Sequence, residues 1–346
     1  MIAWNGRNLS NPMTGVQRYT SEIVARFPAD QLLRVAPDAA WSSGVRGHMW
    51  EQIKLPTQLG GRLLWSPANT GPLTVANQVL SVMDMSPLDN PERLSAKFAA
   101  WYGFLLPKLL RRVRTVLTIS EFSRERILHH VPEIADRIRV TPLAADARFK
   151  RADAARVDMV RRKFGIPTPH YLIGLGSLEP RKNLPRLIEA WRIAQQRLPD
   201  DVSLVIAGGA GKSIVFGNHD VGELPPRTIL TGRVDDDDLP ALYSGAIASI
   251  YVSLYEGFGL PPLESMSCGT PVIASNAGAI PEVVGDSAIL VDPLDIESIA
   301  DGVVKMVDDT AMQQYLRELA LKRATLFNWD ETARLTWAGL QEAYRS

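Results

Sequence analysis

Residues 248–274 read A-S-I-Y-V-S-L-Y-E-G-F-G-L-P-P-L-E-S-M-S-C-G-T-P-V-I-A, and this stretch decides the fold. It opens with an apolar run from Ala248 to Val252, which predicts a buried strand. A turn rich in glycine and proline follows, and Pro262 to Cys268 is predicted to enter a helix. Pro271 to Ala274 is a second short apolar run. A strand, a helix and another strand in so short a segment predict a parallel β-α-β unit.

The same alternation runs through the rest of the second half of the chain. Further strands are predicted at 171–176, 202–207, 228–230 and 288–291, and helices at 184–198 and 239–246. Strands that alternate with helices in this way predict a parallel sheet covered on both faces, which is a Rossmann-like layer.

The first half repeats the pattern less clearly. Strands are predicted at 2–4, 63–65, 78–82, 115–119 and 139–141, and helices at 16–27 and 120–131, the second with Ser120 as its N-cap. Two prolines and a glycine between Phe164 and Pro169 indicate a boundary. We therefore expect an α/β protein with an N-terminal domain at 1–165 and a C-terminal domain at 166–327. A final helix at 328–346 has an apolar face that needs a partner to cover it.

Composition narrows the class of protein. The 346 residues are enough for two domains, and 46% are apolar and 22% charged, as in ordinary globular proteins. Residues 1–165 carry 24 Lys and Arg against 14 Asp and Glu, whereas residues 166–346 carry 14 against 24. The basic half favours anionic partners, and the acidic half argues against nucleic acid. A single cysteine, Cys268, and the lack of a signal peptide or an apolar run of about 20 residues predict a cytoplasmic protein.

The turn at 255–264 has the chemistry of a phosphate and sugar site. Gly257 and Gly259 let the backbone approach a ligand closely, and the helix that follows would offer free N–H groups to a phosphate. A carboxylate and a phosphate repel each other, so Glu264 suits vicinal hydroxyls such as those of a ribose. Glu256 would lie on the reacting side of the crevice. The spacing alone is equally typical of a Gly-Pro turn with two solvated glutamates.

Several motifs in order resemble one family. Glu256-x7-Glu264 within E-G-F-G-L-P-P-L-E resembles the E-x7-E motif of retaining glycosyltransferases, in particular family 4 (the group 1 glycosyltransferases) with the GT-B fold. Three further segments resemble the same family: Gly176–Asn183 (G-S-L-E-P-R-K-N), Ser267–Ile273 (S-C-G-T-P-V-I) and Gly278–Glu282 (G-A-I-P-E). The resemblance implies two Rossmann-like domains that face each other across a cleft, with the final helix crossing back to the N-terminal domain.

The resemblance also implies residue roles on the donor side. Glu264 would hold the ribose of a nucleotide-sugar donor, and Glu256 with the backbone of Phe258 and Gly259 would meet the sugar hydroxyls. The amide of Leu260 would face the phosphates. Lys182, with Arg181 as its helper, would neutralise the leaving diphosphate, because fixed cations stabilise charge that develops in a dry cleft.

Other positions carry weaker implications from the same family. The backbone of Val234 would read the base, Gly15 would approach the phosphates from the other domain, and Asn69 would line the acceptor side. The run Asp235 to Asp238 invites a metal interpretation, but we favour a helix N-terminus stabilised by its dipole, and we expect no metal.

One departure concerns the reaction centre. Many family members have His-Asp after the strand at 78–82, whereas this chain has Met83-Asp84. Methionine neither donates a hydrogen bond nor carries a proton. Asp84 or groups of the substrate would then take over the role of that histidine. The thioether of Met83, on the acceptor side, would pack well on the methyl group of a 6-deoxyhexose such as rhamnose or fucose.

The segment Lys97 to Arg114, K-F-A-A-W-Y-G-F-L-L-P-K-L-L-R-R-V-R, is a candidate for membrane contact. Basic amphipathic helices bind anionic membranes. The alternative is a helix that packs on its own sheet and presents its arginines to solvent.

Together these features predict a retaining, metal-independent enzyme that transfers a hexose or 6-deoxyhexose (mannose, rhamnose or fucose type) from a nucleotide sugar. We expect no cofactor, and GDP is slightly favoured over UDP or dTDP. The acceptor would be a growing, lipid-linked bacterial polysaccharide or O-antigen. Alternatives are a GT-B epimerase or phosphorylase, a non-catalytic sugar-nucleotide binder, and an NAD-dependent oxidoreductase suggested weakly by Gly174-Leu175-Gly176.

Overall fold

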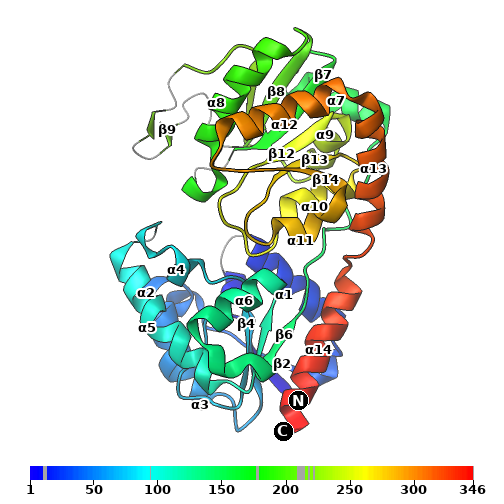
Figure 1. The fold of residues 1–346 in the computed structure, drawn as a ribbon. Helices are drawn as coiled ribbons and strands as arrows, with labels where there is room; N and C mark the ends of the chain where they lie inside the picture. Colours follow the sequence, from blue (N-terminus) through cyan, green and yellow to red (C-terminus); the bar gives the residue numbers. More distant parts are fainter. Residues whose placement is uncertain are drawn as a thin grey trace. The chain divides into compact units, whose positions relative to one another are not determined.

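The computed structural model describes residues 1–10, 14–93, 95–176, 179–208, 215–216, 219–220 and 223–345. The chain divides into two compact units (Figure 1). Unit 1 comprises Met1–Ala144 and Phe327–Ser346, and unit 2 comprises Ala145–Leu326. Within the described residues, no helix combines the length and the hydropathy needed to cross a bilayer.

Unit 1 is built on a parallel sheet of six strands in the order β2-β1-β3-β4-β5-β6. Its strands are β1 (Ile2–Asn5), β2 (Leu32–Val35), β3 (Leu64–Ser66), β4 (Gln78–Val82), β5 (Thr115–Thr118) and β6 (Ile138–Val140). The strand order reverses between β1 and β3, so the loops after these two strands leave the same edge of the sheet in opposite directions.

The helices of unit 1 surround this sheet. They are α1 (Gly15–Arg26), α2 (Gly44–Met49), the π-helix η4 (Trp50–Lys54), α3 (Leu55–Thr57), α4 (Ser86–Asp89), α5 (Ala96–Arg112), α6 (Glu121–His130) and α14 (Trp329–Arg345). As predicted, Ser120 caps α6, and its Oγ accepts a hydrogen bond from the amide of Ser123 at 2.9 Å. Helix α5 buries Tyr102, Leu105, Leu106, Leu109 and Leu110, so its apolar face packs inward.

The tail helix α14 lies within unit 1 (Figure 1, red). The ring of Trp337 lies 4.7 Å from that of Phe27, and Arg139 pairs with Glu342 at 2.6 Å. A Cβ atom at Gly339 would approach Leu117 of β5 to 2.8 Å, which shows how closely the helix packs on the sheet. The partner that the apolar face of this helix requires is therefore the sheet of unit 1 itself.

Unit 2 has a second parallel six-stranded sheet in the order β11-β8-β7-β12-β13-β14. Its strands are β7 (His170–Leu175), β8 (Val202–Ala207), β11 (Thr228–Gly232), β12 (Ala248–Tyr251), β13 (Val272–Ser275) and β14 (Ala288–Val291), with a short antiparallel pair β9 (Val215–Phe216) and β10 (His219–Asp220). Counted within the unit, the order is 3-2-1-4-5-6, the doubly wound arrangement of dinucleotide-binding folds, with its switch point between β7 and β12.

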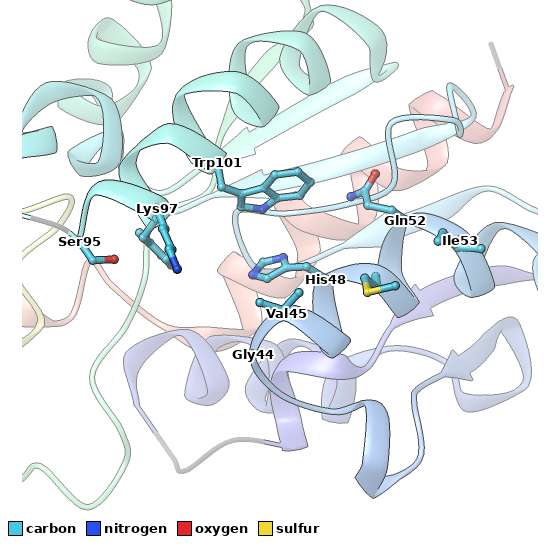
Figure 2. Close-up of a pocket in the computed structure, with 10 residues that line it drawn as sticks. Gly44, Val45, His48, Gln52, Ile53, Ser95, Lys97 and Trp101 are labelled. Carbon is cyan, nitrogen blue, oxygen red and sulfur yellow. The ribbon is translucent and has the colours of Figure 1, made fainter.

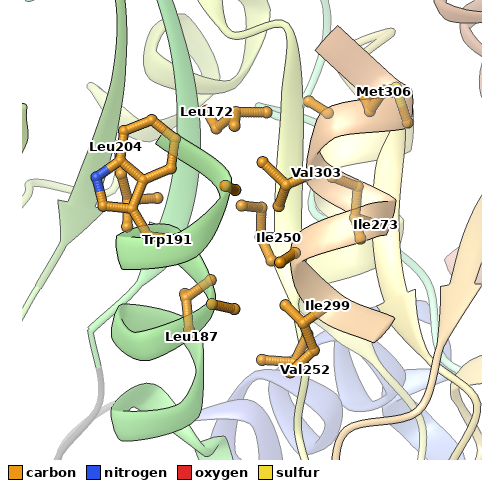
Figure 3. Close-up of a cluster of buried hydrophobic side chains, with 14 of the residues drawn as sticks. Leu172, Leu187, Trp191, Leu204, Ile250, Val252, Ile273, Ile299, Val303 and Met306 are labelled. Carbon is orange, nitrogen blue, oxygen red and sulfur yellow. The ribbon is translucent and has the colours of Figure 1, made fainter. Parts of the chain in front are cut away.

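Helices cover both faces of the second sheet, and a large apolar core holds them in place. The helices are α7 (Ala154–Lys163), α8 (Leu184–Ala194), α9 (Leu239–Gly245), α10 (Leu260–Ser267), α11 (Ile280–Val284), α12 (Ile296–Asp308) and α13 (Thr310–Ala324). Trp191 and Leu187 of α8 pack with Val303 of α12 over Leu172 and Ile250 of the sheet (Figure 3). This core fixes the two central strands from which the candidate site projects.

Two features differ from the sequence-based expectation. The units divide between Ala144 and Ala145, whereas we expected the division between residues 165 and 166. Helix α7 is the reason, because Val160 and Ile166 belong to the same buried cluster as Tyr171 of β7. Strand β2 was also missed, since it is an edge strand with three of its four residues incompletely buried.

Candidate active site

The switch point of unit 2 brings together two of the predicted catalytic segments. Lys182 ends the short 3-10 helix η7 (Pro180–Lys182) that follows β7, and Glu256 lies in the loop that follows β12. Strands β7 and β12 are neighbours in the sheet, so their carboxyl ends place both side chains at one edge. Ligands of open α/β sheets bind in the crevice at this point.

Glu256 is the centre of a charged cluster. Its side chain is 9% exposed. Lys182 Nζ lies 2.7 Å from Oε1, Arg181 Nη1 lies 3.2 Å from Oε2, and the Tyr251 hydroxyl donates to Oε1 at 3.0 Å. A buried carboxylate is stable only when charge and hydrogen bonds compensate its lost hydration. Two cations and a phenol provide that compensation here.

Tyr251 links the carboxylate and the ammonium group. Lys182 Nζ donates to its hydroxyl oxygen at 2.5 Å, while the hydroxyl donates to Glu256. Burial raises the pKa of Tyr251 well above its ordinary value, and the Glu256 carboxylate raises this pKa further, so the phenol stays protonated. Of the three N–H bonds of the ammonium group, the described residues accept two, and one remains for a ligand oxygen.

Asn183 sets the position of Lys182. Its backbone lies in the left-handed region, at φ 61°, and its side chain is buried. Its Nδ2 donates to the carbonyl oxygens of Val252 at 3.1 Å and Pro293 at 2.6 Å, so the end of η7 is anchored to the loop after β12. The motif residue Asn183 therefore has a structural role. Ser177 and Leu178 of the same motif lie outside the described residues.

The backbone of Glu256 is held from the other side by Gly278 and Ala279. The amide of Ala279 donates to the carbonyl of Glu256 at 3.0 Å. Gly278 has φ 64°, and a Cβ atom there would lie 2.8 Å from both the nitrogen and the carbonyl oxygen of Glu256. The glycine of the G-A-I-P-E motif is thus required by the close approach of two loops.

Helix α10 begins at the glycine turn, as predicted. Gly259 is its N-cap with φ 119°, a conformation that favours glycine, and Phe258 is buried beside it. Pro261 and Pro262 carry no N–H, so Leu260 provides the one backbone donor among the first three residues of the helix. Leu260 is half-buried.

Glu264 lies at the fifth position of α10, one turn beyond the helix start. It is 8% exposed, and its carboxylate is close enough to affect two neighbours. Burial raises the pKa of Cys268 to about 12, with Glu264 as the second cause, and the pKa of Tyr243 rises for the same two reasons. Glu264 is therefore an interior carboxylate on the same loop and helix as Glu256, which contradicts the alternative of two solvated glutamates.

The acidic run before α9 forms ion pairs with basic residues. Asp238, the N-cap position of α9, pairs with Arg156 of α7 at 2.7 Å and also with Lys163. Asp237 lies 3.3 Å from Arg148. Val234, just before the run, is half-buried against the core of unit 2. Among the described residues, no group of three or more His, Cys, Asp or Glu side chains is arranged to hold a metal ion.

The four predicted residues of unit 1 lie at the carboxyl ends of its strands or at a helix start. Gly15 is the first residue of α1 and is exposed. Asn69 has φ 59°, and its Oδ1 accepts the amide of Met83 at 2.6 Å, so these two acceptor-side residues are in contact. Met83 is 6% exposed. Asp84 Oδ1 accepts the amide and hydroxyl of Ser86 at the start of α4.

Sequence reasoning missed two polar groups. Tyr251 was read only as a strand residue, although a phenol at the carboxyl end of a strand beside the E-x7-E turn was a usable signal. Glu51 was not singled out. It is fully buried in the π-helix η4 and accepts hydrogen bonds from Asn5 at 2.6 Å and Thr70 at 3.0 Å. Its partners lie 46 and 19 residues away in sequence, so spacing gave no indication of them.

The chain has two doubly wound units, and a buried glutamate, a lysine and an arginine lie at the switch point of the second. This is a GT-B architecture, as predicted. Residues 158–323 match the family model described as glycosyl transferases group 1. The matched segment contains the whole charged cluster, and the match confirms the predicted class, a group 1 glycosyltransferase.

Several sequence relatives are named as mannosyltransferases. The chain is 33% identical over 233 residues to O-antigen chain mannosyltransferase B of Escherichia coli, which covers 67% of this chain and 61% of that protein. It is 30% identical over 271 residues to the serotype-specific mannosyltransferase WbdA of Escherichia coli, covering 76% and 33%. The chain thus spans less than two thirds of the length of each of these relatives.

Solved structures agree with the fold over nearly the whole chain. Anabaena HepE in complex with UDP and glucose matches with a TM-score of 0.76 at 19% identity, covering 98% of this chain and 99% of that one. WaaG, a glycosyltransferase involved in lipopolysaccharide biosynthesis, matches with a TM-score of 0.70 at 16% identity, covering 98% of each. At these identities the likeness establishes the GT-B fold.

Proposed function

We propose that this chain transfers a hexosyl group from a nucleotide sugar to a growing bacterial glycan of the O-antigen type. The observation that carries the proposal is the cluster of Glu256, Lys182, Arg181 and Tyr251 at the switch point of a group 1 glycosyltransferase domain. The names of the sequence relatives support the glycan class and the hexose.

The proposed reaction follows from the charges of the cluster. The bond between C1 of the sugar and the diphosphate oxygen breaks while the acceptor oxygen bonds to C1 on the same face, so the configuration is retained. Lys182 and Arg181 stabilise the charge on the leaving diphosphate, and a phosphate oxygen takes the proton of the acceptor hydroxyl. The two side chains provide the cationic charge that a metal ion would otherwise supply, so the proposal is metal-independent.

The donor would be held by the residues of the glycine turn. Glu256 and the Phe258 and Gly259 backbone bind sugar hydroxyls, the Leu260 amide meets a phosphate, and Glu264 binds the ribose. The backbone of Val234 would meet the base. Glu264 is fixed in a helix and buried, as a hydroxyl acceptor must be to hold one geometry.

Mannose is the proposed hexose, and GDP the proposed nucleotide. The relatives' names favour mannose. The 6-deoxyhexose alternative depended on Met83, and this side chain is 6% exposed, which leaves little of its surface for a sugar methyl group. Asp84 keeps its proposed catalytic role, and its Oδ1 accepts the amide of Ser86 at 3.0 Å.

The acceptor is proposed to be lipid-linked, with unit 1 resting on an anionic membrane through Lys97–Arg114. Phe98 and Phe104 are 40% and 50% exposed on this helix, although Tyr102 and the four leucines of the helix are buried, and Lys108 lies over the Phe104 ring. Sedimentation with liposomes that contain or lack anionic lipid tests the contact. Equal recovery with both kinds of liposome would refute it.

Two measurements test the activity. A thermal-shift panel of GDP, UDP, dTDP and NAD identifies the nucleotide, and GDP is expected to give the largest shift. Transfer from GDP-mannose to an O-antigen fragment is then followed by product mass. A new sugar nucleotide formed without acceptor would instead establish an epimerase, turnover that requires free phosphate would establish a phosphorylase, and a shift with NAD alone would contradict the proposal.

A further inference from the structure

Unit 1 contains a pocket that the proposed reaction does not use. It has a volume of about 670 Å³, within the usual range of small-molecule sites. It lies between α2 with η4 on one side and the first turns of α5 on the other (Figure 2). Its lining residues are Gly44, Val45, His48, Met49, Gln52, Ile53, Ser95, Lys97, Phe98 and Trp101.

The lining is apolar and open to solvent. Val45, Ile53 and Met49 are 77%, 62% and 46% exposed, and Phe98 is 40% exposed on the opposite wall. Apolar side chains that gather around a concavity rather than lying singly on the surface mark a binding site. An aliphatic chain of a ligand would bury these side chains and gain the corresponding hydrophobic free energy.

The polar groups of the pocket are few and suit an anion at one end. Lys97 lies at the start of α5, and the lining contains neither Asp nor Glu. Within the described part of the chain, the buried atoms Trp101 Nε1 and His48 Nδ1 have no hydrogen-bond partner, and their two rings meet edge to face with centroids 5.7 Å apart. A cation at the rim of an apolar pocket favours an amphiphile with a negatively charged head over an uncharged one.

One wall of the pocket is tied to the loop that carries Asn69. Gln52 donates to the carbonyl of Gly71 at 2.8 Å and accepts the amide of Leu73 at 3.0 Å. The neighbouring Glu51 accepts the Thr70 hydroxyl at 3.0 Å. The pocket therefore adjoins the carboxyl end of β3, where we proposed the acceptor side.

We propose that this pocket holds the aliphatic chain of the lipid-linked acceptor, with the lipid phosphate at Lys97. The identity of the ligand as an acceptor rests on the proposed glycosyl transfer. The ligand is a single lipid phosphate molecule taken into the pocket, so its binding does not require a bilayer. A lipid chain anchored here would hold the attached glycan near Asn69.

Farnesyl phosphate, in monomeric form and without vesicles, is the probe, and calorimetric titration of the whole protein is the measurement. We expect farnesyl phosphate to bind, farnesol to bind about tenfold more weakly, and inorganic phosphate to give no detectable heat. Val45→Asp and Ile53→Asp should each weaken farnesyl phosphate binding by about tenfold or more, because a charge enters the apolar lining. Both positions are well exposed, so both variants should fold.

Two matched controls separate the pocket from general effects. Leu294→Asp places the same charge at an equally exposed apolar residue of unit 2, 64% exposed, and should leave binding unchanged. Lys108→Glu alters the same helix outside the pocket and should have little effect, whereas Lys97→Glu should weaken binding about tenfold. Equal losses for Lys97→Glu and Lys108→Glu, or no difference between Ile53→Asp and Leu294→Asp, would overturn the proposal.

The same samples distinguish this proposal from the proposed function. A thermal shift with GDP but no farnesyl phosphate binding overturns the pocket proposal alone. If farnesyl phosphate binds but no nucleotide gives a thermal shift, the pocket is a lipid phosphate site, and the proposed glycosyl transfer is wrong. A dimer that dissociates in Val45→Asp, together with no lipid binding, would assign the apolar face to a second copy of the chain and overturn the proposal.

Discussion

Glu256 shows how a single side chain acquires several partners in an enzyme interior. Its carboxylate is buried and takes one hydrogen bond from an ammonium group, one from a guanidinium group and one from a phenol. A donor that binds here shares Lys182 and Arg181 with Glu256, and its phosphate charge attracts both cations. The cluster therefore holds its cations in place before the donor arrives, which lowers the cost of reorganisation during the reaction.

Replacing Lys182 with methionine is expected to reduce turnover far more than stability. The substitution removes a cation from the leaving diphosphate, and losing one such stabilising group costs about 10²–10³ in kcat. Glu256 keeps Arg181 and Tyr251, so the variant should fold with a similar Tm. Lys150→Met, at an exposed lysine of the same unit, should retain parent activity. Steady-state transfer assays and thermal melts measure both effects, and a Lys182→Met kcat equal to that of Lys150→Met would refute the role.

His48 is expected to make the stability of the protein depend on pH. Burial lowers its pKa, and the nearby Arg7 lowers it further, although Glu51 acts in the opposite sense. Above pH about 6.5 the imidazole is neutral in both the folded and the unfolded state, so it contributes no pH dependence. Below this value the unfolded chain binds the proton more readily, so the free energy of unfolding falls as the pH falls. Urea unfolding between pH about 7 and 5 should therefore show that the free energy of unfolding falls more steeply for the parent than for His48→Gln. Parallel profiles would contradict the expectation.

The resemblance of short motifs to one family singled out Glu256, Glu264 and Lys182, which spacing alone did not distinguish from residues of an ordinary turn. Lys182 and Glu256 lie in the segments that follow β7 and β12, and Glu264 lies in the helix after the second segment. The carboxyl ends of neighbouring parallel strands meet at one edge of a sheet, so the fold brings Lys182 and Glu256 together. Tyr251, Glu51 and the buried amide of Asn183 were not found as part of a site. The partners of Glu51 and Asn183 come from distant segments, so their roles become visible only when the chain is folded. Tyr251 lies five residues before its partner Glu256, and its place beside the E-x7-E turn was a signal that the sequence reasoning did not use.

At the scale of elements, two glycines allow the segments of the candidate active site to turn or to approach each other closely. Gly259 starts α10 and Gly278 precedes α11, and both have positive φ. Elements with strong periodicity were predicted from sequence nearly to their ends, as for β8 and β12. The edge strand β2 and the short helices α2 and α3 were missed, because half-buried segments of three to six residues have no clear period.

Gly278→Ala is expected to reduce both stability and activity. The new Cβ would meet the Glu256 backbone at 2.8 Å, in addition to the strain of a non-glycine residue at φ 64°. Gly269→Ala is the matched control, because it has φ 71° but its Cβ would lie 3.5 Å from Leu321, an ordinary contact. Each substitution should cost about 1–2 kcal/mol for the left-handed backbone. Only Gly278→Ala should also lower kcat by about tenfold or more, since it displaces Glu256. Equal kcat values in the two variants would show that the close approach does not position Glu256.

At the scale of the whole molecule, the chain forms two units, and the second interrupts the first. Unit 1 is completed only when α14 returns after residue 326 and packs on β4 and β5. The two Rossmann-like layers were predicted from the alternation of strands and helices. The boundary at Ala144 was not, because α7 has little apolar periodicity before Pro167 and joins unit 2 through Val160. The two units should therefore respond differently to a change in the tail.

Leu340→Ala tests this dependence of unit 1 on its tail helix. Leu340 is fully buried, and deleting such a side chain costs about 2–5 kcal/mol. Tyr344→Ala removes a side chain that is 57% exposed on the same helix and should change stability by less than about 0.5 kcal/mol. Hydrogen exchange should accelerate in β4, β5 and α1 of the Leu340→Ala variant and stay unchanged in β7, β8 and β12. Nucleotide binding should persist, because Glu256, Lys182 and Glu264 all belong to unit 2. Uniform acceleration across both units would show instead that they unfold together, and that the cluster at the switch point depends on the tail helix.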